Sequence, residues 1–595
     1  MIQYETKNPW DAARTEIFFN QSTNNLAYRD RLNIVHDLNS FGNEVQTLNI
    51  NVPGVINIVY TNGTDAYLWD VETSTYVAIG TRGANYIIVK GTGTPVENAV
   101  ELQEAYNYAT TVEPNGNPLD LANRFTIVVS PGYYDFNSAY ETAFEISYSY
   151  IDLTSLTGNK DVIIQGGIFL SNGLSNISNM IITNGIFTVP NDYVGVITNC
   201  ESLENFSFSP GTTSGTFTGT FIDCVAGDYA FGFYQEVVGT FKNCTAGAYS
   251  FGSSDDINIA SGYAQGIFTD CVAGSYSFGV YGGANGTFTN CKAQNYSFGY
   301  GCDASGSFTN CKGQEFCFGV GDVALEILTS ASGTFIDCQA DNYSFGYLYR
   351  ANGTFIKCTG HAYCFGSTQF GTITSETGGT FTDCVSGQYS FGYCGEAAGI
   401  YNNCQAGSYS FGSSTSSSFI ASCNGVFTNC SSTEFSFGYL GNIVANTVFT
   451  NCTSGQYSFC STDDTNSNIY TEGTFNNCHA NRYSFGFNTD VRGGNFNNCT
   501  ANSYSFGGGN SATTYVNSEV NFNSCTAGDY SFGSFVDFQG KASYCIGGDL
   551  SFGGDNVLSG NLYYCQLTTG NFITVSGSGV TRYCVNADNT TDNQG

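Results

Sequence analysis

The sequence predicts an all-β protein built as a parallel β-helix, a solenoid in which each coil lies on the coil before it. A phrase of about 20 residues recurs along most of the chain. It reads Gly-Thr-Phe-Thr-Asn-Cys, then a few small residues, then Tyr-Ser-Phe-Gly, which suits short strands separated by turns. No helical period appears inside the phrase. We therefore expect about 17–20 coils with one repeat in each.

Cysteine and phenylalanine mark fixed positions of the repeat. Because consecutive coils stack in register, we expect like side chains to form columns along the axis. Small apolar thiols and aromatic rings suit the interior of such a solenoid. The expected interior columns include Cys224, Cys244, Cys271, Cys291, Cys311, Cys338, Cys358, Cys384, Cys404, Phe231, Phe251, Phe278 and Phe298.

The Tyr-Ser-Phe segment admits two orientations. If it is a strand, Tyr and Phe share one face and Ser takes the other. We expect Tyr and Phe to point inward, because an exposed column of Phe would form a very large apolar patch. In the alternative the Ser position is interior, since Ala230, Cys317 and Cys364 replace Ser there, and another chain covers the aromatic column. Where Asn or Asp precedes the marker Cys, it is expected to turn a corner in the left-handed conformation.

Composition excludes several classes of protein. The net charge is −32 and only 11% of residues are charged, which argues against nucleic acid and against an anionic membrane surface. No apolar run approaches membrane-spanning length, so membrane insertion is not expected. The first 19 residues lack the apolar core of a signal peptide. We expect folding in a cytoplasm.

The 24 cysteines are expected to be reduced. Cysteines that occupy one position of every coil point in parallel directions, and this geometry does not favour disulfides. The chain has no Cys-x-x-Cys pair and only three His, so neither a metal site nor a cofactor is predicted.

The chain divides into five parts. Residues 1–50 form an attachment or oligomerisation segment, in which apolar positions between 32 and 48 suggest a short helix; the alternative is an irregular segment that wraps a partner. Residues 51–92 form a small β module with strands at 55–60, 66–70 and 76–80. Residues 93–194 hold an amphipathic helix over 96–110 and the irregular first coils. The regular repeat spans 195–572, and 573–595 form a tail or cap.

Six insertions of the regular repeat follow the Phe-Gly pair. Because they occur at one register, they should leave the same flank, where contact with a partner is best tolerated. They span 253–265, 320–332, 367–378, 413–424, 461–472 and 508–520.

Two stretches resemble known families. Residues 60–70 resemble small β modules of bacteriophage tail fibres. The helix of 96–110 and the apolar strand that ends at Pro131, Gly132 and Tyr134 resemble the entry to pectate-lyase-like right-handed β-helices, in which the helix caps the open end. The whole chain is similar to bacteriophage tail fibres and tailspikes. This resemblance implies a virion protein that forms a homotrimer, attaches to tail or baseplate proteins through its N-terminus, and binds a host-surface glycan or receptor.

Tyr, Asn, Ser and Thr in the insertions suit sugar binding by stacking and hydrogen bonding. The candidate receptor-binding residues are Asp255, Asp256, Tyr263, Asp463, Asp464, Tyr470 and Tyr515.

Other functions have weaker support in the sequence. Glycoside hydrolysis needs two carboxylates at a defined separation, whereas adjacent Asp residues such as 255 and 256 point apart on an extended segment. No catalytic residues are therefore predicted, and a tailspike depolymerase is an alternative to the tail fibre. A bacterial surface adhesin is a second alternative. An ice-binding face is disfavoured, because outward Thr pairs such as Thr287 and Thr289 are interrupted in other coils.

Overall fold

The structure, a computed structural model, describes residues 85–594 except for 210–214, 257–261, 323–324, 326, 371–374, 417–420, 464–468, 510–514, 535–536, 554–557 and 573–578. Of residues 1–84 it gives only the backbone of seven strands. The chain forms two compact units, residues 1–250 (unit 1) and 251–595 (unit 2), which we describe separately.

The N-terminal strands form two small sheets. Strands β1–β3 pair antiparallel, and β4–β7 form a second sheet. The expected helix between 32 and 48 is wrong, because 35–37 and 45–47 are strands; the expected strands at 66–70 and 76–80 are confirmed. The strands are β1 (Ile17–Asn20), β2 (Asn25–Arg29), β3 (Val35–Asp37), β4 (Val45–Thr47), β5 (Val59–Thr61), β6 (Ala66–Asp70) and β7 (Thr75–Gly80).

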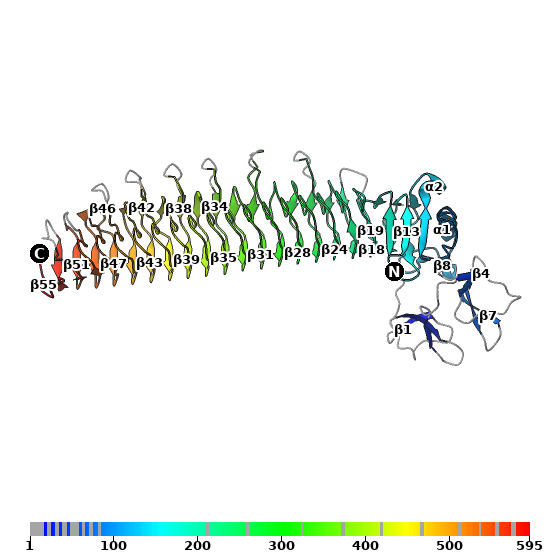
Figure 1. Cartoon of the computed structure of the whole chain (residues 1–595), viewed down its shortest axis with the longest axis horizontal. Helices are drawn as coiled ribbons and strands as arrows, with labels where there is room; N and C mark the ends of the chain where they lie inside the picture. Colours follow the sequence, from blue (N-terminus) through cyan, green and yellow to red (C-terminus); the bar gives the residue numbers. More distant parts are fainter. Residues whose placement is uncertain are drawn as a thin grey trace. The chain divides into compact units, whose positions relative to one another are not determined.

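Helix α1 (Pro95–Ala109) covers the first coils of unit 1, as the sequence predicts. It packs on the first strands of the solenoid and on the short helix α2 (Phe136–Tyr140), and Figure 1 shows both helices beside these strands. Thr94 caps its start, with the Glu97 carboxylate and the Thr94 hydroxyl bonding each other's backbone N–H. Leu102 and Tyr106 face the solenoid, whereas Val96 is exposed. The helix therefore covers an edge that is otherwise open to pairing.

The strands of the described solenoid of unit 1 fall into four parallel sheets, three of which we call sheets 1, 2 and 3 in the order in which the chain visits them. Sheet 1 contains β8 (Tyr86–Val89), β9 (Phe125–Val129), β12 (Ile151–Ser155), β15 (Ile177–Ser178), β18 (Val196–Thr198), β21 (Thr220–Ile222) and β24 (Thr240–Lys242). Sheet 2 contains β10 (Gly132–Asp135), β13 (Val162–Gln165), β16 (Met180–Thr183), β19 (Glu201–Ser202) and β22 (Val225–Ala226). Sheet 3 begins with β20 (Thr216–Phe217) and β23 (Glu236–Val237), and a separate three-stranded sheet contains β11 (Phe144–Ile146), β14 (Ile168–Leu170) and β17 (Phe187–Thr188).

Unit 2 repeats the same coil, and its strands follow one another as parallel rungs in Figure 1. Sheet 1 contains β26 (Ile267–Thr269), β28 (Thr287–Thr289), β29 (Ser307–Thr309), β31 (Thr334–Ile336), β33 (Thr354–Ile356), β35 (Thr380–Thr382), β37 (Ile400–Asn402), β39 (Val426–Thr428), β41 (Val448–Thr450), β43 (Thr474–Asn476), β45 (Asn495–Asn497), β47 (Asn521–Asn523), β49 (Lys541–Ser543), β51 (Asn561–Tyr563) and β53 (Val580–Arg582).

Sheet 3 of unit 2 receives the chain after each insertion. It contains β25 (Tyr263–Ala264) and β27 (Gly283–Ala284), then β30 (Ser330–Ala331), β32 (Arg350–Ala351), β34 (Ser375–Thr377), β36 (Gly395–Ala397), β38 (Ala421–Cys423), β40 (Gly441–Ile443), β42 (Tyr470–Thr471), β44 (Asp490–Val491), β46 (Tyr515–Val516) and β48 (Asp537–Phe538). Sheet 2 is reduced to single bridges until β50 (Ile546–Gly547), β52 (Gln566–Leu567) and β54 (Cys584–Val585), and β55 (Thr591–Asp592) pairs antiparallel with β54. Each unit is thus a right-handed parallel β-helix, as the sequence predicts.

Two columns of aromatic rings fill the interior. In unit 2 the ring of the Thr-Phe-Thr strand stacks on its equivalent in the next coil, as Phe288 does on Phe308 at 4.8 Å between centroids. The Phe of Tyr-Ser-Phe forms the second column, in which Phe278 stacks on Phe298 at 4.8 Å. All thirteen cysteines and phenylalanines expected in the interior columns lie there, each with 0% of its surface exposed. The alternative is therefore wrong about an outward Phe column, although its interior Ser position is confirmed.

The expectation that Tyr also points inward is wrong, and its reason is the backbone. Tyr296 and Phe298 have φ angles of 57° and 53°, so the segment is a turn, and side chains do not alternate as they do in a strand. As a result Ser297 and Phe298 are both buried, while Tyr296 lies outside the coil and is half-buried. Ser297 Oγ accepts from the backbone N–H of Ser277 at 3.2 Å, which explains why this interior position is polar.

The marker cysteines stack in one file, and every cysteine is a free thiol. Cys291 Sγ lies 3.4 Å from the carbonyl oxygen of Phe268 and 3.5 Å from that of Thr289. The residue before the Cys turns the corner as expected: Asn310 has a φ of 52°, and its side-chain amide donates to Asn290 Oδ1 at 2.9 Å. The Gly of the motif is needed because a Cβ on Gly306 would collide with the carbonyl oxygen of Gly286.

Candidate functional site

The candidate site is the flank of unit 2 where the insertions return to sheet 3. Strands β25, β30, β34, β38, β42 and β46 each follow an insertion, and from β30 onward they alternate with strands of uninserted coils in one ten-stranded sheet. Because sheet 3 is parallel and in register, all these insertions rejoin the solenoid along one edge. The structure describes the bases of these insertions.

A column of half-buried aromatic rings runs beneath this flank. Tyr276 stacks on Tyr296 at 4.8 Å, and Tyr296 stacks on Phe316 at 4.9 Å. Stacking covers both faces of each ring inside the column, so only ring edges and hydroxyl groups reach the solvent. This column therefore offers hydrogen-bonding groups, not the open ring faces on which a sugar stacks.

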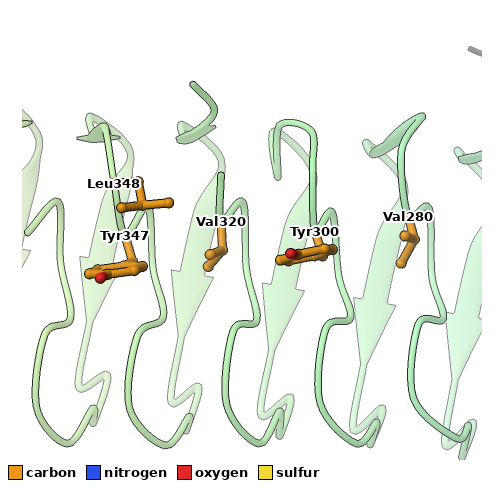
Figure 2. Close-up of a cluster of buried hydrophobic side chains, with 5 residues drawn as sticks. All are labelled: Val280, Tyr300, Val320, Tyr347 and Leu348. Atoms are coloured by element: carbon orange, nitrogen blue, oxygen red, sulfur yellow. The ribbon is translucent and has the colours of Figure 1, made fainter. Parts of the chain in front are cut away.

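A second set of buried side chains lies between this column and the insertions. It consists of Val280, Tyr300, Val320, Tyr347 and Leu348, which occupy equivalent turns of neighbouring coils (Figure 2). Tyr300 meets Tyr296 edge to face at 4.8 Å, and Tyr347 meets Tyr343 in the same way at 4.9 Å. The bases of the insertions thus rest on a small apolar core of their own.

Tyr300 of this set, and Tyr439 at the equivalent turn of a later coil, each hold the following insertion by a hydrogen bond. Tyr300 Oη donates to Asp322 Oδ2 at 2.9 Å, and Tyr439 Oη donates to Asp463 Oδ1 at 2.9 Å. Burial, followed by the hydrogen bond to Asp463 and its charge, raises the pKa of Tyr439. Asp463 is exposed, but its carboxylate has this structural partner.

The remaining predicted receptor residues are spread along the flank. Asp255 is exposed and Asp256 half-buried, and the Asp256 backbone N–H donates to Ser254 Oγ at 3.0 Å. Tyr263 is half-buried in β25, three coils before β30, and Asp464 lies outside the described residues. Their roles as receptor contacts stay predictions.

Tyr470 and Tyr515 lie on either side of Arg492. The Arg492 guanidinium lies over the Tyr470 ring at 4.5 Å from its centroid, bonds Asp490 at 3.2 Å, and has Tyr515 as a further neighbour. An aromatic–cation–acid group of the same type occurs at Arg350, which lies over Tyr349 at 4.5 Å and pairs with Glu376 at 3.0 Å. Among the predicted residues that the structure describes, this tyrosine pair is brought together from different coils around one shared side chain.

Sequence reasoning missed a pair of carboxylates in adjacent coils. Glu376 and Glu396 are direct neighbours in sheet 3. The sequence does carry a signal, since each precedes its Thr-Phe-type strand by four residues. Arg350 pairs with Glu376, and Asn424 donates to Glu396 Oε1 at 2.9 Å, so both carboxylates have structural partners.

Sequence reasoning also missed an exposed aromatic stack near the C-terminus. Tyr544, Tyr564 and Tyr583 stand directly before marker cysteines, where earlier coils mostly carry Asn or Asp. Their side chains are 59%, 49% and 61% exposed. The change of residue type at this position is visible in the sequence.

Two kinds of feature, a cluster of metal ligands and a membrane-spanning helix, are both absent from the part of the chain that the structure describes. Across these residues no group of three or more His, Cys, Asp or Glu is placed to hold a metal ion. Nor does any helix among them have the length and apolar character needed to span a membrane.

These observations define a parallel β-helix protein with insertions along one flank. No protein-family model matches the chain, and no curated protein matches its sequence. Two solved structures show a distant likeness. The chain is 9% identical to sacteLam55A from Streptomyces sp. SirexAA-E, with 86% of this chain and 98% of that chain covered and a TM-score of 0.17. It is 10% identical to ORF18 of Geobacillus virus E2, with 92% and 73% covered and a TM-score of 0.12. At these TM-scores neither likeness bears on function.

Proposed function

We propose that the protein is a virion appendage, a bacteriophage tail fibre that attaches the particle to its host. The observation that carries this proposal is the row of insertions that rejoin one edge of sheet 3 in unit 2. A rigid solenoid with variable segments on one flank suits the display of contacts to a host-surface glycan or receptor. In this proposal the N-terminal segment binds tail or baseplate proteins of the virion.

The proposal includes no catalytic step. Glu376 and Glu396 are a pair of carboxylates in register, but Arg350 and Asn424 bond them. A general acid and a nucleophile for glycoside cleavage must remain available to the substrate. An adhesive role therefore agrees better with these contacts than depolymerase activity.

We further propose that the protein assembles with copies of itself as a homotrimer through sheet 1 of unit 2. From β26 to β43 every outward side chain of this sheet is Thr, Ser, Ile, Val or Asn, although the chain carries a net charge of −32. Ile267 is 52% exposed and Ile400 48%. Charged residues occur at the neighbouring corner, as at Asp337 and Lys357. An uncharged centre with a charged rim is typical of protein interfaces.

Immunogold electron microscopy of virus particles tests the attachment role. Antibodies raised against unit 2 should label an appendage of the particle, and the purified full chain should compete with particles for binding to host cells. Particles without label, or the release of reducing ends from host polysaccharide by the purified chain, would contradict the proposal.

A further inference from the structure

The last coils of unit 2 break a rule that the other corners follow. Between sheet 1 and sheet 2, the residue before the marker Cys is Asn or Asp in most coils of unit 2, with Lys357 and Ser524 as exceptions. In three consecutive coils at the C-terminal end it is Tyr: Tyr544, Tyr564 and Tyr583.

This exchange is unfavourable for the backbone. The three tyrosines have φ angles of 57°, 55° and 58°. The left-handed conformation costs about 1–2 kcal/mol for a residue with a bulky side chain, whereas Asn tolerates it. The corner itself does not require Tyr, because Tyr544 N–H donates to Tyr563 O at 2.9 Å just as Asn310 N–H donates to Ile336 O at 2.8 Å. Phe298 holds the same conformation in the packed interior, whereas the exposed side chains of Tyr544, Tyr564 and Tyr583 have no interior packing that would hold them there. Backbone strain at such positions is grounds for a functional hypothesis.

The rings form a stack that remains open to the solvent. Tyr544 and Tyr564 lie 5.0 Å apart with planes at 3°, and Tyr564 and Tyr583 lie 4.9 Å apart with planes at 11°. Stacking returns about 0.5–1.5 kcal/mol for each pair, yet about half or more of each side chain stays exposed. A contiguous row of exposed aromatic rings is typical of an interaction surface.

Beside Tyr544 the stack meets a corner with a small side chain, Ser524, which we call the Ser524 step. The space beside Tyr544 suits a ring-shaped ligand. The corner before Tyr544 is Ser524, whose small side chain leaves the adjoining face of the Tyr544 ring without an aromatic neighbour. Exposed Asn521 and Asn523 of β47 lie in the same coil as Ser524. An open aromatic face beside amide donors and acceptors matches the apolar face and the hydroxyl groups of a sugar ring.

The charges that sheet 1 places near the stack are positive, whereas Asp592 of β55 lies opposite Cys584. Lys541 Nζ lies 5.8 Å from the Tyr563 ring centroid, and Arg582 is the neighbour of Tyr563 in sheet 1. The outward positions of β49, β51 and β53 carry no acidic residue. In a chain of charge −32, this local composition makes the surface compatible with acidic as well as neutral sugars.

We propose that the Tyr544–Tyr564–Tyr583 stack, with the Ser524 step, binds an oligosaccharide by stacking a pyranose ring on Tyr544. This inference rests on the proposed attachment function and names its ligand class. It places ligand binding at the corner of sheets 1 and 2, away from the insertions that the sequence favours.

Two variants of the full chain test the site in opposite ways. Tyr544→Asn/Tyr564→Asn/Tyr583→Asn restores the residue type of the other corners and removes the rings. Ser524→Tyr extends the stack by one ring and fills the step. Tyr148→Asn, which removes an exposed tyrosine of unit 1, is the matched control. Circular dichroism and thermal unfolding establish that each variant folds.

Binding is measured on an array of maltohexaose, hexa-N-acetylchitohexaose and hyaluronan hexasaccharide, followed by titration calorimetry. The wild type should bind at least one of them, and both site variants should weaken binding by about tenfold or more, while the control does not. Of the three oligosaccharides, only hyaluronan is charged, so only its binding should weaken when salt is added. Equal binding by wild type and site variants, or no binding of any of the three by the wild type, would overturn the inference.

Host-cell binding separates this inference from the proposed function. If the folded triple variant binds host cells as well as the wild type does, the stack is not the glycan site, but attachment stands. If the wild type binds oligosaccharides through the stack but labels no virus particle, the site stands and the virion role does not.

Discussion

Phe288 and Phe298 meet edge to face in the interior of unit 2, with ring centroids 5.7 Å apart and ring planes at 90°. Each ring also stacks face to face on its equivalent in the next coil. The rings of each column are therefore held in place by those of the other. Phe298→Ala should lower the free energy of unfolding by about 3–5 kcal/mol, because it leaves a cavity in this lattice. Phe298→Leu should cost less, since it retains most of the volume. Thermal unfolding of both variants checks this order, and equal losses would contradict it.

The corner residue Asn310 should be replaceable by Gly more readily than by Ala. Its φ of 52° disfavours a Cβ-bearing residue without a polar side chain. Asn310→Ala loses both this tolerance and the hydrogen bond to Asn290, and should destabilise by about 1–2 kcal/mol. Asn310→Gly loses only the hydrogen bond. An Ala variant as stable as the Gly variant would show that the corner carries no strain.

The hydrogen bond from Tyr439 to Asp463 should hold the base of the 461–472 insertion. Tyr439→Phe removes the donor at nearly constant volume and should speed amide hydrogen exchange in the described residues at that base, with a loss of about 1 kcal/mol. Tyr457→Phe is the matched control, because Phe435 occupies the equivalent position one coil earlier. This role would be contradicted if exchange at that base became faster in the control, or if it did not become faster in Tyr439→Phe.

Buried thiols should make the protein less stable in alkaline solution. Burial raises the pKa of Cys317 and of Cys364 to about 12, against about 8.5 for a thiol in an unfolded chain. The folded state therefore keeps protons that the unfolded state loses. This stability is fully present below about pH 8.5 and is lost as pH rises towards 12.

Cys317→Ser/Cys364→Ser should reduce this pH dependence. Ser occupies the same interior position in most other coils, so the variant should fold. Its Tm should fall less than that of the wild type between pH 7 and pH 10.5, in reducing buffer. Parallel Tm curves would show that these two thiols do not titrate on unfolding.

Charge placed on sheet 1 should prevent the proposed self-association. Ile400→Lys/Val426→Lys puts two cations on exposed positions, where the monomer loses little stability. We expect a shift from trimer to monomer in sedimentation equilibrium. Thr240→Lys in unit 1 lies outside the proposed face and should leave the mass unchanged. A wild-type monomer would contradict the proposed assembly.

The repeat made the register of the coils predictable, since Phe288, Cys291 and their equivalents recur at fixed positions and stack in register. It did not reveal the path of Tyr-Ser-Phe. Positive φ angles at bulky residues such as Tyr296 and Phe298 are unusual, and composition alone favours a strand there. The turn is stabilised by contacts between coils, including the Ser column, which a single repeat does not display.

The candidate site was harder to predict than the fold. Tyr470 and Tyr515 are apart in sequence, and only the pairing of sheet 3 brings both beside Arg492. Glu376 and Glu396 likewise become neighbours only through the register of sheet 3. Tyr544 was detectable as an exception to the corner rule, but its exposure depends on the path of the coil.

The alternation of inserted and uninserted coils in unit 2 sets a rule for how such a chain can change length. From β30 to β48 the neighbours of each inserted coil are uninserted. Tandem duplication or loss of one coil would bring two insertions together or leave a gap in their row. Duplication of two coils keeps both the packing and the order of insertions, because each coil depends only on its neighbours. A chain of this kind can therefore lengthen or shorten by pairs of coils, one inserted and one uninserted, without disturbing the row of insertions.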